Sequence, residues 1–247
     1  MLDLIISTLT GLTETIAAKP AFGVALTLGF FLAAKKLYRR YPSPITHPLL
    51  ISSAAIIFFL TLLGIDYHTY QQGGQLISFL LGPATVALAI PLYKNSQRIS
   101  QQLTLIITSV AAGTLTAMLI AVFTVKLLGG TTELILSMVP KSVTTPIAIE
   151  ISHIVGGVPS LTSVFVVITG LVGAILGPAL LSYTGLASPI STGLALGTAA
   201  HGIGTGRALQ EGEIQGAYSG LAMGLAGLIT AFAAPLAVKL FHIIGLF

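Results

Sequence analysis

Apolar residues run along this chain in stretches long enough to cross a lipid bilayer, and polar residues gather between those stretches. A transmembrane helix needs about 20 consecutive apolar residues. No Asp, Glu, Lys or Arg occurs between Glu150 and Arg207, an interval long enough for two crossings. The pattern predicts an all-α integral membrane protein with about eight transmembrane segments, at 20–38, 48–64, 75–93, 103–128, 132–153, 161–183, 189–207 and 214–241.

The composition excludes a soluble domain of this size. Only 7% of the residues are charged and the mean hydropathy is +0.98, too little polar surface to cover a water-soluble fold. We expect residues 19–247 to form one polytopic membrane domain. Residues 1–18, with Asp3 and Glu14 around apolar positions, are predicted to form an interfacial helix, the alternative being a poorly inserted extra span.

Basic residues predict the orientation, because Lys and Arg accumulate in short cytoplasmic loops. With eight crossings, Lys35 to Arg40, Lys94, Arg98 and Arg207 share one side, which we assign to the cytoplasm. The loops predicted on the other side, 65–74 and 184–188, contain neither Lys nor Arg, and both termini would lie outside. The net charge of +4 then reflects contact with anionic lipid headgroups and not nucleic-acid binding.

The chain has no cysteine, so disulfides, thiol chemistry and thiolate metal sites are excluded. Its amino terminus lacks the features of a cleaved signal peptide or an organelle transit peptide. We therefore expect a multi-pass protein of the bacterial cytoplasmic membrane, without a cofactor.

Three apolar stretches carry residues that interrupt helices. Pro83 and Pro91 fall within 81–93, two prolines fall within 140–148, and alternating glycines fill 197–208. Unwound backbone survives at membrane depth only when it is buried in protein or lines a wet cavity. The three stretches are therefore expected to meet at an internal site.

The first two of these stretches resemble each other, with Pro-x-Thr-Val at 83–86 and Pro-x-Ser-Val at 140–143. Interrupted spans in corresponding positions are typical of secondary transporters built from repeats. Whether 132–157 crosses the membrane or turns back as a hairpin stays open, and so does whether the repeats are inverted.

Lys141 is the most informative polar residue, because a cation between two prolines in an apolar segment is costly unless it is paired. The hydroxyls of Ser142, Thr144 and Thr145 and the freed amides of a helix start would complete an anion-binding cradle. The alternative is that Lys141 reaches toward an interface and Pro140 only kinks the span.

His201, Thr205 and Arg207 lie in the glycine-rich stretch. His201 could donate to a carboxylate or carry a proton, and Arg207 could recognise a carboxylate in a bidentate manner. The alternatives are a packing histidine and a basic anchor near Glu211.

Glu150 and His153 are three residues apart and share one helical face. A single pair of this kind favours a structural or proton-relay role over a metal site. The ladder of Gly216, Gly220 and Gly224, extended by Gly227, permits close helix approach, and a protomer contact in a homodimer is one use of it. No arrangement for hydrolytic chemistry is present, so an enzyme is not expected.

At these motifs the chain resembles the LrgB family, also called CidB/LrgB or holin/antiholin-like. The resemblance covers nearly the whole chain after about residue 20, although the family motif often has alanine where this chain has Gly202 and Gly206. The matching stretches are LLGPATVALAIPLY at 80–93, PKSVTTPIA at 140–148, GGVPSLT at 156–162 and GTAAHGIGTGRALQEGEIQGAYSGLAMGL at 197–225.

The resemblance implies two descriptions. One is modulation of murein hydrolase activity and cell lysis beside a small LrgA-type membrane partner. The other, through the carboxyl-terminal half of the plastidal glycolate/glycerate translocator, is transport of small 2-hydroxy or 2-oxo monocarboxylates such as glycolate, glycerate, lactate or pyruvate. The family motifs fall on Pro83, Thr85, Lys141, Ser142, Thr144, Thr145, His201, Thr205 and Arg207.

The residues favour the second description. A cation and several hydroxyls among broken helices suit a site of substrate size, whereas a holin-like lesion needs only a coarse lumen. We therefore predict a monocarboxylate transporter with the carboxylate held at Lys141, its hydroxyl neighbours and half-helix amino termini. The proton-coupling candidates are Glu150, His153 and His201, and the alternative function is the holin/antiholin-like one.

Overall fold

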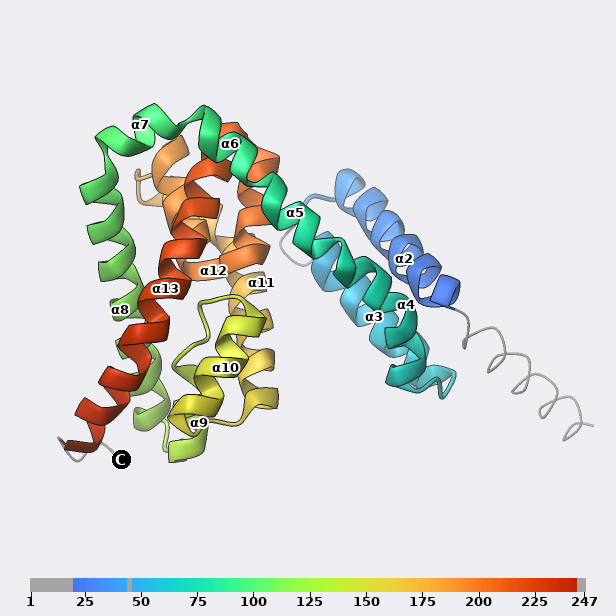
Figure 1. Ribbon diagram of the computed structural model, residues 1–247. Coiled ribbons are helices and arrows are strands. Elements are labelled where there is room, and N and C mark those ends of the chain that lie inside the picture. Colours follow the sequence, from blue (N-terminus) through green and yellow to red (C-terminus); the bar gives the residue numbers. More distant parts are fainter. Residues whose placement is uncertain (1–19, 44–45, 244–247) are drawn as a thin grey trace, which may run out of the picture. The chain divides into compact units, whose positions relative to one another are not determined.

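The computed structural model describes residues 20–43 and 46–243 (Figure 1). Within those ranges all regular secondary structure is helical, which confirms the predicted all-α class. The interfacial helix expected at 1–18 lies outside the described residues. The chain divides into two compact units at the boundary between Ala87 and Leu88, and each unit is described by itself.

Among the described residues, the first unit contains four helices and the second contains eight. Their bounds are α2 Pro20–Arg40, α3 Pro48–Leu62, α4 Tyr67–Phe79 and α5 Leu81–Ala87, followed by α6 Ala89–Lys94, α7 Ser96–Gln101, α8 Leu103–Leu127, α9 Thr132–Met138, α10 Thr145–Val155, α11 Pro159–Tyr183, α12 Pro189–Glu211 and α13 Glu213–Ile243.

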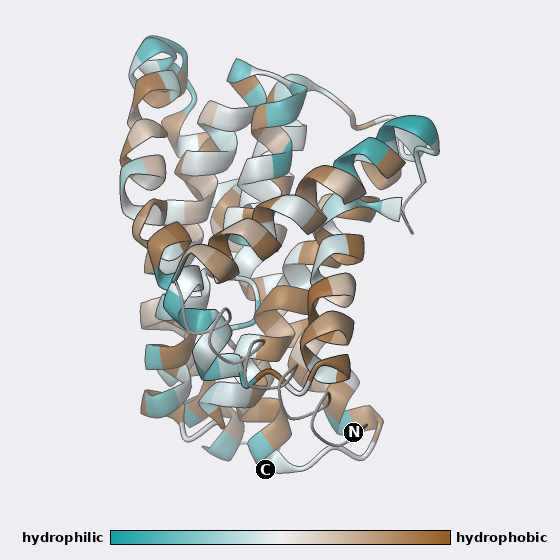
Figure 2. Cartoon of the chain, turned by 90° about the vertical axis from the view of Figure 1, so that its right-hand side faces the viewer, coloured by the Kyte–Doolittle hydropathy of each residue, from teal (hydrophilic) through white to brown (hydrophobic). Residues whose placement is uncertain are grey.

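Five of the described stretches are long and apolar enough to cross a membrane. Figure 2 shows the corresponding pattern, with hydrophobic residues along the helices and hydrophilic ones gathered toward helix ends. Helix α3 is apolar but shorter. The five stretches are Pro20–Arg40, Tyr67–Lys94, Leu103–Leu127, Pro159–Tyr183 and Glu213–Ile243.

In the first unit, α2 packs against α3 and α4. Gly23 and Gly73 lie where α2 and α4 touch, and a side chain on Gly73 would collide with the backbone of α2. The hydroxyls of Thr27 and Tyr70 are 2.8 Å apart across the same contact. Tyr70 therefore links α4 to α2.

The interruptions expected in 81–93 occur just before each proline. Regular helix stops at Leu80 and at Leu88, three residues ahead of Pro83 and Pro91. Proline removes an amide donor and crowds the carbonyl one turn earlier, so the break falls on its amino-terminal side.

The second unit is built around the long helices α8, α11 and α13. Helix α13 packs against α8 along two clusters of buried apolar residues. The Tyr218 cluster includes Ile106 and Val110 from α8. The Val122 cluster includes Met118 from α8 and Ala234, Val238 and Phe241 from α13.

The segment from α9 to α10 doubles back on itself, and we call it the first hairpin. The amide of Val158 donates to Ser137 Oγ at 2.8 Å, so the end of α10 returns to the level of α9. The hydroxyl of Thr162 in α11 donates to Ser137 O at 2.9 Å and lies 2.8 Å from Ser152 Oγ. Both ends of the first hairpin therefore lie at the end of the unit where α8 stops and α11 begins (Figure 1).

Helix α12 also doubles back, and we call it the second hairpin. His201 has φ 43° and ψ −131°, which ends the first half of α12 and redirects the chain. A Cβ added to Gly204 would meet the carbonyl of Leu196, so the two halves lie against each other. Ser219 of α13 contacts both Gly197 in the first half and Thr205 in the second half.

The two hairpins correct the predicted topology. The segment 189–207 was expected to cross the membrane, but it turns back at His201. The eight-span prediction also counted 132–153 as a crossing and left a hairpin over 132–157 open, and the structure has the hairpin. The loop 184–188, predicted on the side opposite Arg207, therefore lies at the same end as the start of α13. Glu213 at that end is 3.4 Å from Lys94. Two crossings are removed together, so α13 still ends on the side opposite Lys94.

Candidate functional site

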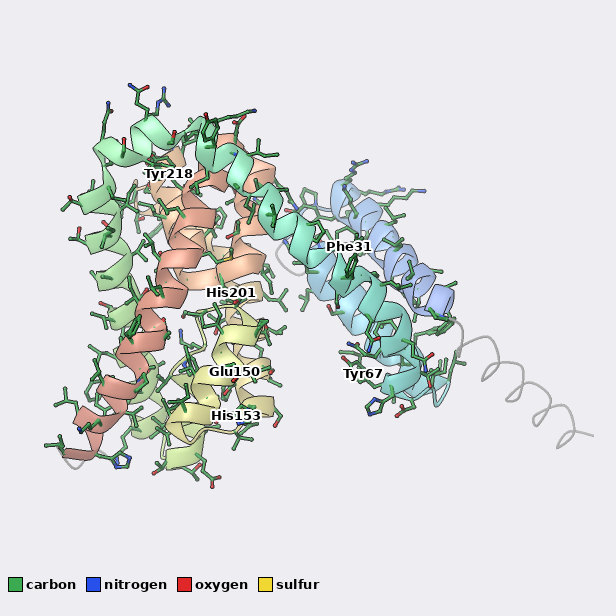
Figure 3. All side chains as sticks on the ribbon, viewed as in Figure 1. Phe31, Tyr67, Glu150, His153, His201 and Tyr218 are labelled. Carbon is green, nitrogen blue, oxygen red and sulfur yellow. The ribbon has the colours of Figure 1, made fainter. Side chains whose placement is uncertain are left out.

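The tips of the two hairpins approach each other from opposite ends of the second unit. Lys141 at the first tip is close enough to His201 at the second to act on it electrostatically. In Figure 3 His201 lies beyond the amino-terminal end of α10, the helix that carries Glu150 and His153. Two of the three interrupted stretches therefore meet, as expected, and their tips form the candidate site.

Lys141 lies in the turn between α9 and α10 and is partly buried. Its Nζ donates to Ser142 Oγ at 3.0 Å. Among the described residues, no carboxylate lies within 4.0 Å of this ammonium group. An ammonium has three protons to donate, so Lys141 retains donor capacity at the tip.

The amino terminus of α10 lies directly after Lys141. Thr144 is the N-cap residue, but its side chain makes no capping hydrogen bond, and Pro146 has no amide proton. The first amides of a helix have no partner inside the helix, and their dipoles favour a negative charge. Thr144 and Thr145 are half-buried at this end, so the predicted cradle residues of the first tip do lie together.

His201 is 4% exposed and tied to α11. Its Nε2 donates to the carbonyl of Val166 at 3.0 Å. A Cβ added to Gly170 of α11 would come within 2.9 Å of the imidazole ring, so the ring fills the space above that glycine. One ring nitrogen is therefore engaged in holding the second tip in place.

Thr205 serves the same hairpin from its second half. Its hydroxyl donates to the carbonyl of His201 at 2.9 Å and lies 3.0 Å from Ser219 Oγ. Because the Thr205 proton is used on the carbonyl, Ser219 supplies the proton of the second bond. The Thr205 hydroxyl is thus bonded within the second hairpin and to α13, and its predicted role as a binding residue stays a prediction.

Arg207 is paired inside its own helix. Its Nη2 lies 3.0 Å from Glu211 Oε1, one helical turn further on, and both side chains are partly exposed. This matches the alternative of a basic anchor beside Glu211. Carboxylate recognition by Arg207 stays a prediction.

Glu150 and His153 lie on one face of α10, as their spacing indicated (Figure 3). Both side chains are exposed on the second unit. They lie along α10 away from its amino-terminal end, so the proton role proposed for them stays a prediction. Among the described residues, no three His, Asp or Glu side chains gather in a metal-binding group.

Pro83 and Thr85 belong to α5 in the first unit. Pro83 is exposed on that unit. A role for either residue at the hairpin tips stays a prediction.

Most of the glycine ladder on α13 packs against neighbours in the same chain. A Cβ on Gly216 would meet Leu209, one on Gly220 would approach Leu88, and one on Gly227 would lie 3.1 Å from Ile147 Cδ1. Only Gly224 of the ladder faces open space. The ladder therefore serves the fold of the second unit, which removes the argument it gave for a homodimer.

The sequence did not single out two buried threonines, Thr114 in α8 and Thr230 in α13. Their hydroxyls have no hydrogen-bond partner within the described part of the chain. An isolated threonine in an apolar helix gives no sequence signal, because such hydroxyls usually bond to their own helix.

Comparisons with known proteins show similarity along most of the chain. The LrgB-like family matches residues 27–240. The Bacillus subtilis (strain 168) proteins YwbG and YxaC are 42% and 41% identical to the chain, over 85% and 89% of it and 93% and 96% of their own lengths. Holin-like protein CidB of Staphylococcus aureus (strain Mu50 / ATCC 700699) is 37% identical over 89% of the chain and 96% of its own length. No solved structure matches.

The family match spans most of the chain, both units included, and the similar proteins come from bacteria. Together with the apolar helices, this identifies a multi-pass protein of the bacterial cell membrane. The chain belongs to the LrgB-like family.

Proposed function

We propose that this protein carries a small organic anion, a monocarboxylate of the 2-hydroxy or 2-oxo class, across the membrane. The observation that supports the proposal most is the position of Lys141. It lies at the tip of a hairpin that stops partway through the unit, without a carboxylate partner in the described chain. A cation in such a place is costly unless an anion joins it.

The surroundings of Lys141 suit a carboxylate. The uncapped start of α10 adds amide donors and the positive end of a helix dipole next to the ammonium. Ser142, Thr144 and Thr145 add hydroxyls within five residues of chain. A point charge together with directional donors suits one carboxylate group. The single positive charge of Lys141 would not balance an anion with several negative charges.

The opposed hairpins suit a carrier more than a pore. Two segments that enter from opposite ends and meet near the middle close the path from both sides. Discontinuous helices that meet near the midplane are the form in which many secondary transporters build their binding sites. Movement of one tip relative to the other would open the site to one side at a time.

Uptake into liposomes that contain the purified protein tests this proposal. Labelled glycolate should enter with saturation, and Lys141→Ala should reduce the initial rate at least tenfold. Lys94→Ala is the matched control, because Lys94 is exposed and paired with Glu213 at the helix ends. Equal uptake by wild type and Lys141→Ala, with both proteins folded, would overturn the assignment.

A holin-like function is the second candidate, and one specific observation favours it. CidB of Staphylococcus aureus and CidB of Staphylococcus epidermidis are called holin-like proteins, and that name favours this candidate over a carrier. Under it the protein would modulate murein hydrolase activity and lysis together with an LrgA-type partner. Neither candidate gives the chain a catalytic reaction of its own.

Solute leakage separates the two candidates. A holin-like lesion should release trapped solutes of several sizes from liposomes without saturation, and Lys141→Ala should leave that release unchanged. A carrier should retain a trapped dye of several hundred daltons while it takes up glycolate. Leakage that depends on adding an LrgA-type protein would support the partner as well as the lesion.

A further inference from the structure

Three buried hydroxyls in the second unit have no hydrogen-bond partner in the described part of the chain, and two of them belong to threonines. Thr114 in α8 is 3% exposed and Thr230 in α13 is 2% exposed. Burying a hydroxyl without a partner is unfavourable, and such groups in native proteins call for an explanation. The hydroxyl of Tyr218 is also unpartnered, but it lies within the apolar Tyr218 cluster.

The ordinary solution for a helical threonine or serine is a bond to its own helix. Thr108 in α8 donates to the carbonyl of Thr104 at 2.9 Å, and Ser163 in α11 donates to Pro159 O at 2.9 Å. Thr114 and Thr230 have the same option but do not use it. Their hydroxyls are therefore available to a ligand.

Both threonines lie at the same level of the unit. On α8, Thr114 is one turn from Val110 of the Tyr218 cluster and one turn from Met118 of the Val122 cluster. On α13, Thr230 is one turn from Ala226 of the first cluster and one turn from Ala234 of the second. The two hydroxyls thus form a polar layer between two apolar ones.

Each threonine also lies beside one hairpin tip. Gly113, next to Thr114, faces Thr198, and a Cβ added there would be 3.3 Å from Thr198 Cγ2, one turn before His201. Gly227, one turn before Thr230, faces Ile147 in the first turn of α10. The stretches of α8 and α13 that carry the two threonines therefore run beside chain segments one to two turns from the tips.

We propose that Thr114 and Thr230 bind the second polar group of the anion whose carboxylate Lys141 holds. This inference rests on the proposed carrier function. A hydroxyl can both donate and accept, so it matches the hydroxyl or oxo oxygen on the carbon next to a carboxylate. The methyl group of acetate would leave both threonines unpaired, and sites built to hydrogen-bond a substrate oxygen reject analogues that lack it.

Glycolate and acetate test the inference, because they differ by one hydroxyl. Competition against labelled glycolate uptake gives the apparent affinity of each acid for wild type and variants. Wild type should prefer glycolate at least tenfold. Thr114→Val and Thr230→Val should each lower the apparent affinity for glycolate about tenfold, which corresponds to the loss of one hydrogen bond. The apparent affinity for acetate should stay unchanged.

Two controls keep the outcome clear. Thr108→Val changes an exposed hydroxyl on the same helix and should keep the preference, and Thr114→Ser should restore what Thr114→Val loses. If both valine variants prefer glycolate over acetate by the same factor as wild type, this inference is overturned while the carrier proposal stands. If wild type takes up neither acid, the carrier proposal is overturned and the inference with it.

Discussion

His201 Nε2 lies 3.0 Å from the carbonyl oxygen of Val166, so the point where α12 reverses is bonded to the middle of α11. The same residue has a positive φ of 43°, the only non-glycine residue with a positive φ in the described chain. The reversal therefore combines a strained backbone with a side-chain bond that holds it.

Replacing His201 separates these two contributions. His201→Ala and His201→Gly both lose the ring and its bond to Val166, but glycine adopts a positive φ without strain. We expect the glycine variant to be more stable than the alanine variant by about 1–2 kcal/mol, the reverse of the usual order in a helix. Denaturation of the two purified variants in the same detergent measures the difference. An alanine variant as stable as the glycine variant would show that this backbone carries no strain.

The contact between His201 and Gly170 predicts a second effect. A Cβ at position 170 would lie 2.8 Å from Ile203 Cδ1 and 2.9 Å from the His201 ring. Gly170→Ala should therefore lower stability by about 1–3 kcal/mol through overpacking.

Gly206→Ala is the matched control for Gly170→Ala. Gly206 lies in the second half of α12, where an added Cβ meets nothing within 4 Å. Alanine there should gain up to about 1 kcal/mol of helix propensity. Thermal unfolding of both variants provides the measurement, and equal shifts would contradict the close packing of His201 on α11.

Thr162 predicts how firmly the first hairpin is anchored. This residue is fully buried, donates to Ser137 O at 2.9 Å and lies 2.8 Å from Ser152 Oγ. Thr162→Val keeps the shape of the side chain but leaves both buried groups without this partner, which should cost about 1–3 kcal/mol.

Thr184→Val serves as the comparison for Thr162→Val. Thr184 is exposed at the end of α11, and its hydroxyl bonds only to its own helix. Thr184→Val should change the free energy of unfolding by no more than about 0.5 kcal/mol. Proteolysis of the purified variants should also cut the α9–α10 segment faster in Thr162→Val. Equal stability and equal cleavage would mean that the hairpin is held elsewhere.

The sequence predicts the helical class and the places where helices break, but not the direction the chain takes after a break. Pro83 and Pro91 each lie in the first turn of a new helix, α5 and α6. Pro140 and Pro146 interrupt a segment that turns back as a hairpin. The difference lies in tertiary bonds such as Ser137 to Val158, which span many residues and leave no local pattern.

Some residues of the candidate site can likewise be predicted from the sequence, and others cannot. Lys141 is found from the sequence because a cation in an apolar stretch is rare, and the structure places it in the turn between α9 and α10, bonded to Ser142. Thr205 and Arg207 have the residue types of a binding site, yet their polar groups bond to Ser219 and Glu211. Thr114 and Thr230 escape sequence reasoning because only packing shows that a helical hydroxyl lacks its usual carbonyl.

Cysteine accessibility tests the central claim, that 132–157 and 189–211 are opposed hairpins, most directly. The chain has no native cysteine, so single substitutions carry no background. Positions 187 and 210 lie at the two ends of the second hairpin, and position 160 follows the first. All three are exposed, and the substitutions are Ala187→Cys, Gln210→Cys and Ser160→Cys. In sealed vesicles of one orientation, an impermeant maleimide should label 187 and 210 from the same side and 160 from the other. Labelling of 187 and 210 from opposite sides would mean that α12 crosses the membrane, which would contradict the account.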